Sequence, residues 1–213
     1  MRRTRIDPFV FKASATVAQY SGYFADSART LQTAIEAVPA SSICNHLHHA
    51  LFRLHFTTSE FLNDFASWAW ATLGDEPLAE LLAAVDPLDL VSIEQAREAL
   101  VRIIGDYVGR MEYTPSVGFK QRCCFQSSLT FIYAIGNTVD DLSSFVAAAR
   151  EAPAESIFYH FVVAPVLEGK RDNDFSIWLG AHGWDEEADR VRRLSPYSTD
   201  LYGLGRRIAE VLR

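Results

Sequence analysis

Apolar residues recur at every third or fourth position over most of this chain, which is the spacing of helices that bury one face. The clearest case follows Asp26 and Ser27, either of which can cap a helix. Leu31 and Ile35 then share one face, and Pro39 closes the segment because proline does not continue a helix. The pattern predicts a helix that begins after residue 27 and ends at residue 38.

The same periodicity predicts further helices over residues 42–54, 63–74, 78–85 and 92–104. Asn63 or Asp64 stands where the second of these helices begins, and Gly74 stands near its end. Ser92 is the expected N-cap of the last helix, whereas the polar stretch at 57–60 indicates a loop. A second series of the same kind runs from residue 140 to residue 212.

Two segments fit a strand as well as a helix, residues 10–18 and residues 125–135. The second contains Leu-Thr-Phe-Ile-Tyr at 129–133, a mixture of β-branched and aromatic residues that favours strands. We expect at most one short strand in each half of the chain, and the two strands can pair with each other. The predicted fold class is therefore mainly α.

One motif, Asn-Asp-Phe-x-x-Trp, occurs twice, at residues 63–68 and at residues 173–178. Its members are Asn63, Asp64, Phe65 and Trp68 in the first copy, and Asn173, Asp174, Phe175 and Trp178 in the second. A shift of 114 residues aligns further identical residues in the same order: Phe11 with Phe125, Ser14 with Ser128, Thr16 with Thr130, Gly22 with Gly136, and His46 with His160. Chance can supply any single match, but the ordered set indicates an internal duplication.

The duplication predicts two pseudo-symmetric helical repeats that face each other about an approximate twofold axis. The first repeat covers residues 9–108 and the second covers residues 123–213. The intervening residues 109–122 contain Pro115 and Gly118, which favour a linker. A chain of 213 residues suits one domain or two small ones. Both arrangements of the repeats, as one domain or as two, stay open.

The charge of the chain argues against nucleic acid as a partner. The formal net charge is −7, with 9 Lys and Arg against 13 Asp and Glu up to Arg110, and 11 against 14 beyond it. Neither half is basic, so nucleic-acid binding is not expected, because it requires clustered Lys and Arg against the phosphates. No phosphate-binding loop, dinucleotide glycine fingerprint or nucleophile elbow is present in the sequence.

Cysteine usage and the first residues favour a cytoplasmic protein. The cysteines are Cys44, Cys123 and Cys124, an odd number with two adjacent, which is not a disulfide framework. The basic first residues are followed by Ile-Asp-Pro at 6–8 and not by an apolar run, so we predict no signal peptide. No stretch approaches the ~20 apolar residues of a membrane span, and no membrane contact is expected.

The Asn-Asp-Phe-x-x-Trp motif has a structural explanation that requires no ligand. Asn and Asp are preferred N-cap residues, because their side-chain oxygens accept hydrogen bonds from the first free amides of a helix. Phe and Trp three positions apart lie on one helix face and can anchor that helix in the core. We regard this as the leading interpretation of the motif.

A functional interpretation adds the histidines that precede each motif. His46 and His160 occupy matching places on the preceding helix, so each can approach its own Asp64 or Asp174. A carboxylate beside an imidazole fixes its tautomer and can prepare it for proton transfer or for a metal. The first half also contains His48, His49 and His55, and His46 and His49 share one helix face.

The candidate binding residues are therefore His46, His48, His49, His55, Asp64, His160 and Asp174. His46 and His49 are the pair for a divalent metal, although the second half has Val162 and Val163 where His48 and His49 stand. No catalytic residue is assigned. No cofactor is predicted, and a divalent metal is left open.

Each half contains, in order, Phe-x-x-Ser-x-Thr, a glycine, an amphipathic segment, Pro-x-x-Ser-Ile-x-x-His and Asn-Asp-Phe-x-x-Trp. Over nearly the whole chain this pattern resembles an uncharacterised prokaryotic family, a domain of unknown function. The resemblance implies that some relatives are encoded near trehalose-making or related glycosyltransferases, and it implies no activity. By resemblance, His46, His48 and His55 match the family's histidine-rich stretch. Ser156, His160, Asn173, Asp174, Phe175 and Trp178 match its second copy.

Two positions depart from the family pattern. Gly205 stands where the pattern has an arginine, a place that Arg97 holds in the first half. Cys44-Asn45 replaces what looks like an aromatic pair, as in Phe158-Tyr159. These differences argue against any role that needs the arginine or the aromatic pair in both halves.

The strong framework and the incomplete catalytic groups favour a non-catalytic binding or regulatory protein that docks a partner protein or a small ligand between its repeats. Four tyrosines are candidates for lining such a surface, or else are ordinary packing residues: Tyr20, Tyr23, Tyr113 and Tyr133. The alternatives are a metal-dependent enzyme built on the histidine cluster and an accessory subunit of a sugar-transferring enzyme. A homo-oligomer is left open.

Overall fold

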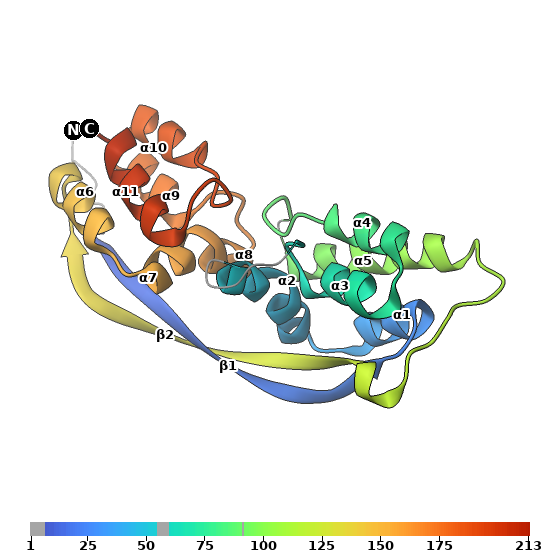
Figure 1. Cartoon of the computed structure of the whole chain (residues 1–213). Coiled ribbons are helices and arrows are strands. Elements are labelled where there is room, and N and C mark those ends of the chain that lie inside the picture. Colours follow the sequence, from blue (N-terminus) through green and yellow to red (C-terminus); the bar gives the residue numbers. More distant parts are fainter. Residues whose placement is uncertain (1–6, 55–59, 91) are drawn as a thin grey trace. The chain divides into compact units, whose positions relative to one another are not determined.

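The computed structural model describes residues 7–54, 60–90 and 92–213 (Figure 1). Two strands, β1 (Phe9–Ala25) and β2 (Cys123–Val139), each precede a series of helices. The first series is α1 (Ala28–Ala37), α2 (Ala40–Leu54), α3 (Asp64–Trp68), α4 (Glu76–Ala83) and α5 (Ile93–Val108). The second is α6 (Leu142–Glu151), α7 (Ala154–Phe158), α8 (Ala164–Glu168), α9 (Asp174–Ala181), α10 (Asp185–Arg192) and α11 (Leu201–Val211).

The prediction of a mainly α fold with at most a short strand in each half is wrong. β1 and β2 are 17 residues long each, and they pair with each other in a two-stranded sheet, so the fold is α/β. In Figure 1 the two strands run alongside each other in opposite directions. Both ambiguous segments, 10–18 and 125–135, lie inside these strands.

The length of the strands was underestimated because their side chains are buried only near the strand ends. In β1 the side chains of Phe9, Phe11 and Ala13 are buried in alternation, but between residues 14 and 24 no side chain is buried. Alternation of apolar and polar residues arises only where one face of a strand packs on a core. The middle of each strand therefore carries no periodic signal, although it belongs to the strand.

The chain forms two compact units that do not follow the order of the sequence. Unit 1 contains residues 1–15 and 130–213, and unit 2 contains residues 16–129. Each strand therefore begins in one unit and ends in the other. The predicted ranges 9–108, 109–122 and 123–213 describe sequence repeats, and they stay a prediction about ancestry.

Unit 2 is built on α1 and α2, which pack against α5, and on α3 and α4, which pack against each other. Its core contains Leu31, Ile35, Ile43, Leu47, Phe65, Leu82 and Leu100 from the helices, together with Phe125 from β2. Fully burying an aliphatic or aromatic side chain contributes about 1.5–3 kcal/mol. The beginning of β2 is thus part of this core.

Unit 1 has the corresponding arrangement. Helix α11 packs against α6 and α7, and α10 packs against α9. Phe145, Ile157, Phe175 and Leu204 are buried between these helices, and Phe11 from β1 is buried with them. Its ring centroid lies 5.7 Å from that of Phe145 and 6.0 Å from that of Phe175. The beginning of β1 therefore belongs to the core of unit 1.

Several local signals for helix ends are confirmed, although α2 begins at Ala40, before the predicted residue 42, and α5 continues to Val108, beyond the predicted residue 104. Ser27 caps α1, Asn63 caps α3 and Ser92 caps α5. Gly74 has φ of 65° at the end of the π-helical turn that continues α3, a conformation that favours glycine. The predicted loop at 57–60 lies largely outside the described residues. Among the described helices, none is both long and apolar enough to cross a membrane.

Candidate functional site

Each Asn-Asp-Phe-x-x-Trp motif begins a helix in the same way. Oδ1 of Asn63 accepts the amide of Ala66 at 2.9 Å and so caps α3. Oδ1 of Asn173 accepts the amide of Ser176 at 2.9 Å and so caps α9. The structural interpretation of the asparagine is therefore confirmed in both copies.

The aspartate of each motif is hydrogen-bonded to the histidine of the preceding helical segment. Nδ1 of His46 lies 2.8 Å from Oδ2 of Asp64, and Nδ1 of His160 lies 2.8 Å from Oδ2 of Asp174. His46 comes from α2, and His160 comes from the π-helical turn Tyr159–Val163 between α7 and α8. The structure thus brings together the two pairs that the sequence predicted.

The other ring nitrogen of each histidine is held by a strand. The backbone N–H of Gln126 in β2 donates to Nε2 of His46 at 3.0 Å. The backbone N–H of Lys12 in β1 donates to Nε2 of His160 at 2.8 Å. A backbone N–H can only donate, so Nε2 carries no proton in either ring. The proton is on Nδ1, which donates to the carboxylate, and both imidazoles are neutral.

Aromatic rings surround both imidazoles. The ring of His160 lies 4.7 Å from Phe9 and 5.3 Å from Phe175, measured between centroids. The ring of His46 lies 5.4 Å from Phe65 and 5.6 Å from Phe125. Such rings exclude water, and burial disfavours a charged imidazole.

Burial changes the protonation equilibrium of His160. It lowers the pKa of His160 below the ordinary value of 6.5, and this effect exceeds the opposing influence of the hydrogen bond and charge of Asp174. The bond from Lys12 acts in the same direction, because an imidazolium cannot accept an N–H. His160 is therefore built to stay neutral.

The tryptophan of each motif is hydrogen-bonded to the residue two positions before a strand. Nε1 of Trp68 donates to the carbonyl of Gln121 at 2.9 Å, and Nε1 of Trp178 donates to the carbonyl of Asp7 at 3.0 Å. Gln121 and Asp7 are separated by the same 114 positions as Gln126 and Lys12. Each motif thus holds a strand at two points, through its aspartate-linked histidine and through its tryptophan.

These contacts limit the chemistry of the two pairs. A general base or a metal ligand needs an imidazole nitrogen with an available lone pair. In both rings the Nε2 lone pair accepts a backbone N–H, and Nδ1 carries the proton that is donated to the carboxylate. Either role would require the ring to break a hydrogen bond that ties a strand to its helices.

His48 is the only other histidine candidate of the first half whose side chain the structure describes, and it does not join His46. Nε2 of His48 lies 3.2 Å from the carbonyl of Pro87, so this buried ring is directed toward another segment. The side chains of His49 and His55 lie outside the described part of the molecule. Among the residues that the structure does describe, no three His, Cys, Asp or Glu side chains gather in a way that could hold a metal ion. The predicted metal pair of His46 and His49 lies partly outside the described residues, because the side chain of His49 is not described.

The cysteines divide into two buried thiols and one exposed thiol. Cys44 and Cys123 are buried, and Cys124 is exposed. Burial raises the pKa of Cys44 and that of Cys123 to about 12 each, so both stay protonated near neutrality. A protonated thiol is a poor nucleophile, and both side chains serve as packing groups.

The two units differ where Arg97 and Gly205 stand. In unit 2 a guanidinium nitrogen of Arg97 donates to the carbonyls of Ile35 and Val38 at the end of α1, the latter at 2.9 Å. In unit 1 a Cβ on Gly205 would lie 2.9 Å from the carbonyl oxygen of Ala149 in α6. The glycine thus permits a closer approach of α11 to α6, which is a feature the sequence pattern flagged but could not explain.

Ser42 and Ser156 occupy equivalent positions, 114 residues apart, and neither was among the predicted binding residues. Each lies four residues before its histidine and is fully buried. The hydroxyl of each has no hydrogen-bond partner among the residues that the structure describes. An unsatisfied buried hydroxyl costs about 1–3 kcal/mol.

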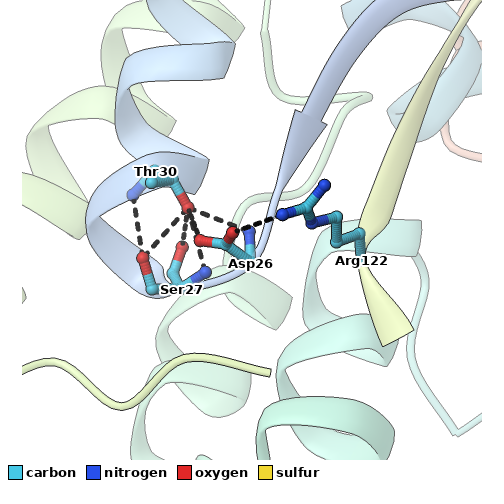
Figure 2. A network of polar contacts seen from close by, with 4 residues as sticks. All are labelled: Asp26, Ser27, Thr30 and Arg122. Atoms are coloured by element: carbon cyan, nitrogen blue, oxygen red, sulfur yellow. Dashed lines mark hydrogen bonds and ion pairs between the residues drawn. The ribbon is translucent and has the colours of Figure 1, made fainter. Parts of the chain in front are cut away.

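A further polar network lies at the end of β1 in unit 2. Figure 2 shows Asp26, Ser27, Thr30 and Arg122, with Thr30 and Ser27 forming a reciprocal capping box at the start of α1. Arg122 pairs with Asp26 at 3.5 Å, and its guanidinium carbon lies 4.2 Å from the ring centroid of Phe24. It also lies 5.0 Å from the ring centroid of Phe119, which is 80% exposed. We call Phe24, Phe119 and Arg122 the arginine–aromatic patch.

The four candidate tyrosines are all exposed, so they are not ordinary core residues. Tyr20, Tyr23 and Tyr113 belong to unit 2, and Tyr133 belongs to unit 1.

Comparison with known proteins agrees with the resemblance to an uncharacterised family. The model of a protein family described as a family of unknown function (DUF5752) matches residues 6–213. A solved structure, that of OrfY from Thermoproteus tenax, is similar with a TM-score of 0.80 and 30% sequence identity over 96% of this chain and 94% of that one. No curated protein matches the chain. These similarities carry no information about an activity.

Proposed function

The chain belongs to the family of unknown function DUF5752, and we propose that it is a non-catalytic binding or regulatory protein that docks a partner protein or a small ligand. One observation carries the proposal. Both imidazoles that could have served as catalytic bases have Nδ1 on a carboxylate and Nε2 on a backbone N–H. The two pairs use their hydrogen-bonding capacity to hold strands, and none of it is left for a substrate.

The arginine–aromatic patch is the surface that we assign to the partner. Arginine and aromatic side chains are enriched among the residues that contribute most to protein interfaces. Phe119 is 80% exposed, and the guanidinium carbon of Arg122 lies 5.0 Å from its ring centroid. A partner that covers Phe119 would remove this ring from water.

The test compares two variants of the full chain as bait in affinity purification from its native host. Phe119→Ala removes the most exposed member of the patch, whereas Tyr202→Ala removes an aromatic ring from α11 that is also more than half exposed. We expect a stoichiometric partner with wild type and with Tyr202→Ala, and a loss of at least about tenfold with Phe119→Ala. Equal retention by all three proteins would refute the patch.

A narrower form of the proposal makes the partner a sugar-transferring enzyme, and its only support is the resemblance to relatives encoded near glycosyltransferases. The test mixes purified candidate enzymes with this chain at micromolar concentration and measures whether they elute together. Co-elution that depends on Phe119 would support the accessory role. Independent elution would count against the accessory role and would leave the wider binding proposal unaffected.

The alternative of a metal-dependent enzyme makes an opposite prediction for tag-free protein. A metal on His46 would displace either the Gln126 amide or the Asp64 carboxylate from the ring. We expect elemental analysis to find no stoichiometric metal, and a chelator to leave the melting temperature unchanged. A bound metal that is lost in His46→Ala would overturn the non-catalytic proposal.

We also infer that the two helical series descend from one duplicated unit. The support is the set of equivalent contacts made by residues 114 positions apart: Gln126 and Lys12 on the histidines, Gln121 and Asp7 on the tryptophans, and Gly22 and Gly136 with φ of 87° and 91°. Related chains supply the test. If their two halves do not align with each other at a similar shift, the inference fails.

A further inference from the structure

The two strands differ from the rest of the chain in charge. β1 and β2 have 17 residues each, and Lys12 is the only charged residue in either of them. Charged residues make up 22% of the whole chain, so several would be expected over this length. Neither strand contains proline. Charges and prolines are the usual devices that keep an exposed strand from pairing with another chain.

The same strands expose large apolar side chains. In β1 these are Val17, Tyr20, Tyr23 and Phe24, and in β2 they are Leu129, Phe131, Ile132 and Tyr133. Each is between 40% and 59% exposed, whereas Phe9, Phe11 and Phe125 near the beginnings of the strands are buried. An exposed group of this kind, without the charges that usually surround it, marks an interaction site.

Among the described residues, the sheet also has no third strand along its edges, although the N–H of Gln126 in β2 and that of Lys12 in β1 are bonded to the histidines. It contains only β1 and β2 in the part of the chain that the structure describes, so each strand has one side without a strand neighbour. A two-stranded sheet is marginally stable in water by itself, and additional strands stabilise it. Of the two edges, that of β2 has no charged residue along its whole length, whereas β1 carries Lys12.

We propose that the edge of β2 around Phe131–Tyr133 pairs with the same edge of a second copy of this chain, antiparallel, to give a four-stranded sheet. Three features select a second copy as the occupant. An uncharged edge meets its own copy without like-charge repulsion, even though the chain carries a net charge of −7. An antiparallel pair of identical strands satisfies the twofold symmetry of a closed dimer. The aromatic and aliphatic composition matches that of homodimer interfaces.

The edge of β2 is separate from the arginine–aromatic patch, which contains no residue of β2. Phe119→Ala is therefore expected to lose the partner and to keep the dimer. Loss of the dimer in that variant would show that the two surfaces are not separate.

The experiment measures oligomeric state by sedimentation and light scattering at about 1 µM and about 100 µM. Phe131→Lys places two like charges at the proposed twofold axis, and it is expected to raise the dimer dissociation constant by about 100-fold or more. The control is Tyr202→Lys, the same chemical change at a similarly exposed site on α11, which is expected to leave the dimer intact.

A wild type that is monomeric at about 100 µM, or a Phe131→Lys variant that is as dimeric as wild type, would overturn the proposal. If Phe131→Lys does not fold, Phe131→Thr keeps a strand-forming residue and removes the ring. Hydrogen exchange of wild type gives a separate check. The amides of residues 131–133 are expected to exchange more slowly at the higher concentration, and equal rates would contradict the pairing.

Discussion

The backbone N–H of Lys12 donates to Nε2 of His160 at 2.8 Å, although 148 positions separate the two residues in sequence. With Nδ1 of His160 on Asp174, this bond makes the imidazole a link between β1 and α9 inside unit 1. His46 makes the equivalent link in unit 2. The predictions below test what these links and their surroundings contribute.

Replacing His160 is expected to destabilise the chain strongly. His160→Ala leaves the Asp174 carboxylate and the Lys12 amide without their partner in a largely apolar site, at a cost of about 3 kcal/mol. His46→Ala should cost about 2 kcal/mol, because the side chain of Asp64 is 38% exposed and that of Asp174 only 19%, so water can replace the lost bond more easily. Urea unfolding measures both. A change below about 0.5 kcal/mol in either variant would contradict the structural role.

Stability is expected to fall as the pH falls below about 6.5. The pKa of folded His160 lies below the ordinary 6.5, so above that value the ring is neutral in both states and its contribution is fully present. As the pH decreases toward the folded pKa, the unfolded chain binds a proton that the folded chain does not, and stability is lost.

Urea midpoints between about pH 7.5 and about pH 5.5 measure this dependence. His160→Gln is the control, because its side-chain amide has both an acceptor for the Lys12 N–H and a donor group for Asp174, and it does not titrate. The slope should be smaller in this variant than in wild type. Identical slopes would show that His160 does not bind a proton on unfolding in this range.

Two glycines give a matched pair of alanine substitutions. A Cβ on Gly205 would meet the backbone oxygen of Ala149 at 2.9 Å, and a Cβ on Gly105 would meet Nε2 of Gln32 at the same distance. A backbone oxygen cannot move without shifting α6, whereas the end of a glutamine side chain can rotate away. Gly205→Ala should destabilise by about 1–3 kcal/mol. Gly105→Ala should be neutral or stabilise by up to about 1 kcal/mol, because alanine favours helix. Thermal melting that ranks the variants in the opposite order would contradict the close packing of α11.

The two capping asparagines are expected to respond differently to aspartate. Nδ2 of Asn63 donates to the carbonyl of Leu82 at 3.0 Å, in addition to the capping bond made by Oδ1. Asn63→Asp keeps a capping oxygen but places a carboxylate against that buried carbonyl, at a cost of about 2 kcal/mol. Asn173→Asp should cost less than about 1 kcal/mol, because aspartate caps helices as well as asparagine does. Urea unfolding at neutral pH compares them, and equal costs would argue against the Leu82 bond.

Removing a buried serine hydroxyl is expected to stabilise each unit. Ser42 and Ser156 have hydroxyls without a hydrogen-bond partner among the described residues. Ser156→Ala and Ser42→Ala should therefore raise the free energy of unfolding by about 1 kcal/mol each. The control is Ser27→Ala, which removes the N-cap of α1 and should destabilise by about 1 kcal/mol. A loss of stability in Ser156→Ala would mean that its hydroxyl has a partner, such as bound water.

The sequence by itself determined the features that depend on neighbours along the chain. Ser27, Asn63, Ser92 and Asn173 cap helices because an N-cap needs only a side-chain oxygen and the next few amides. The aromatic and aliphatic stripes located the buried faces, since helical periodicity is a local property. The pairing of each histidine with the aspartate of its own motif was predictable as well, because those two lie on consecutive helical segments.

Only the tertiary structure decided the length of the strands and the strand amide that each histidine accepts. The middle residues of β1 and β2 pack on no core, so no alternation recorded their extended conformation. Nothing local could show that Lys12, which precedes the first helical series, belongs with His160 in the second. That contact depends on the path of the whole chain, because the first residues of β1 belong to unit 1, whose helices come much later in the sequence. The physical reason is that a backbone N–H has no side-chain identity, so its long-range partner leaves no trace in the residue types.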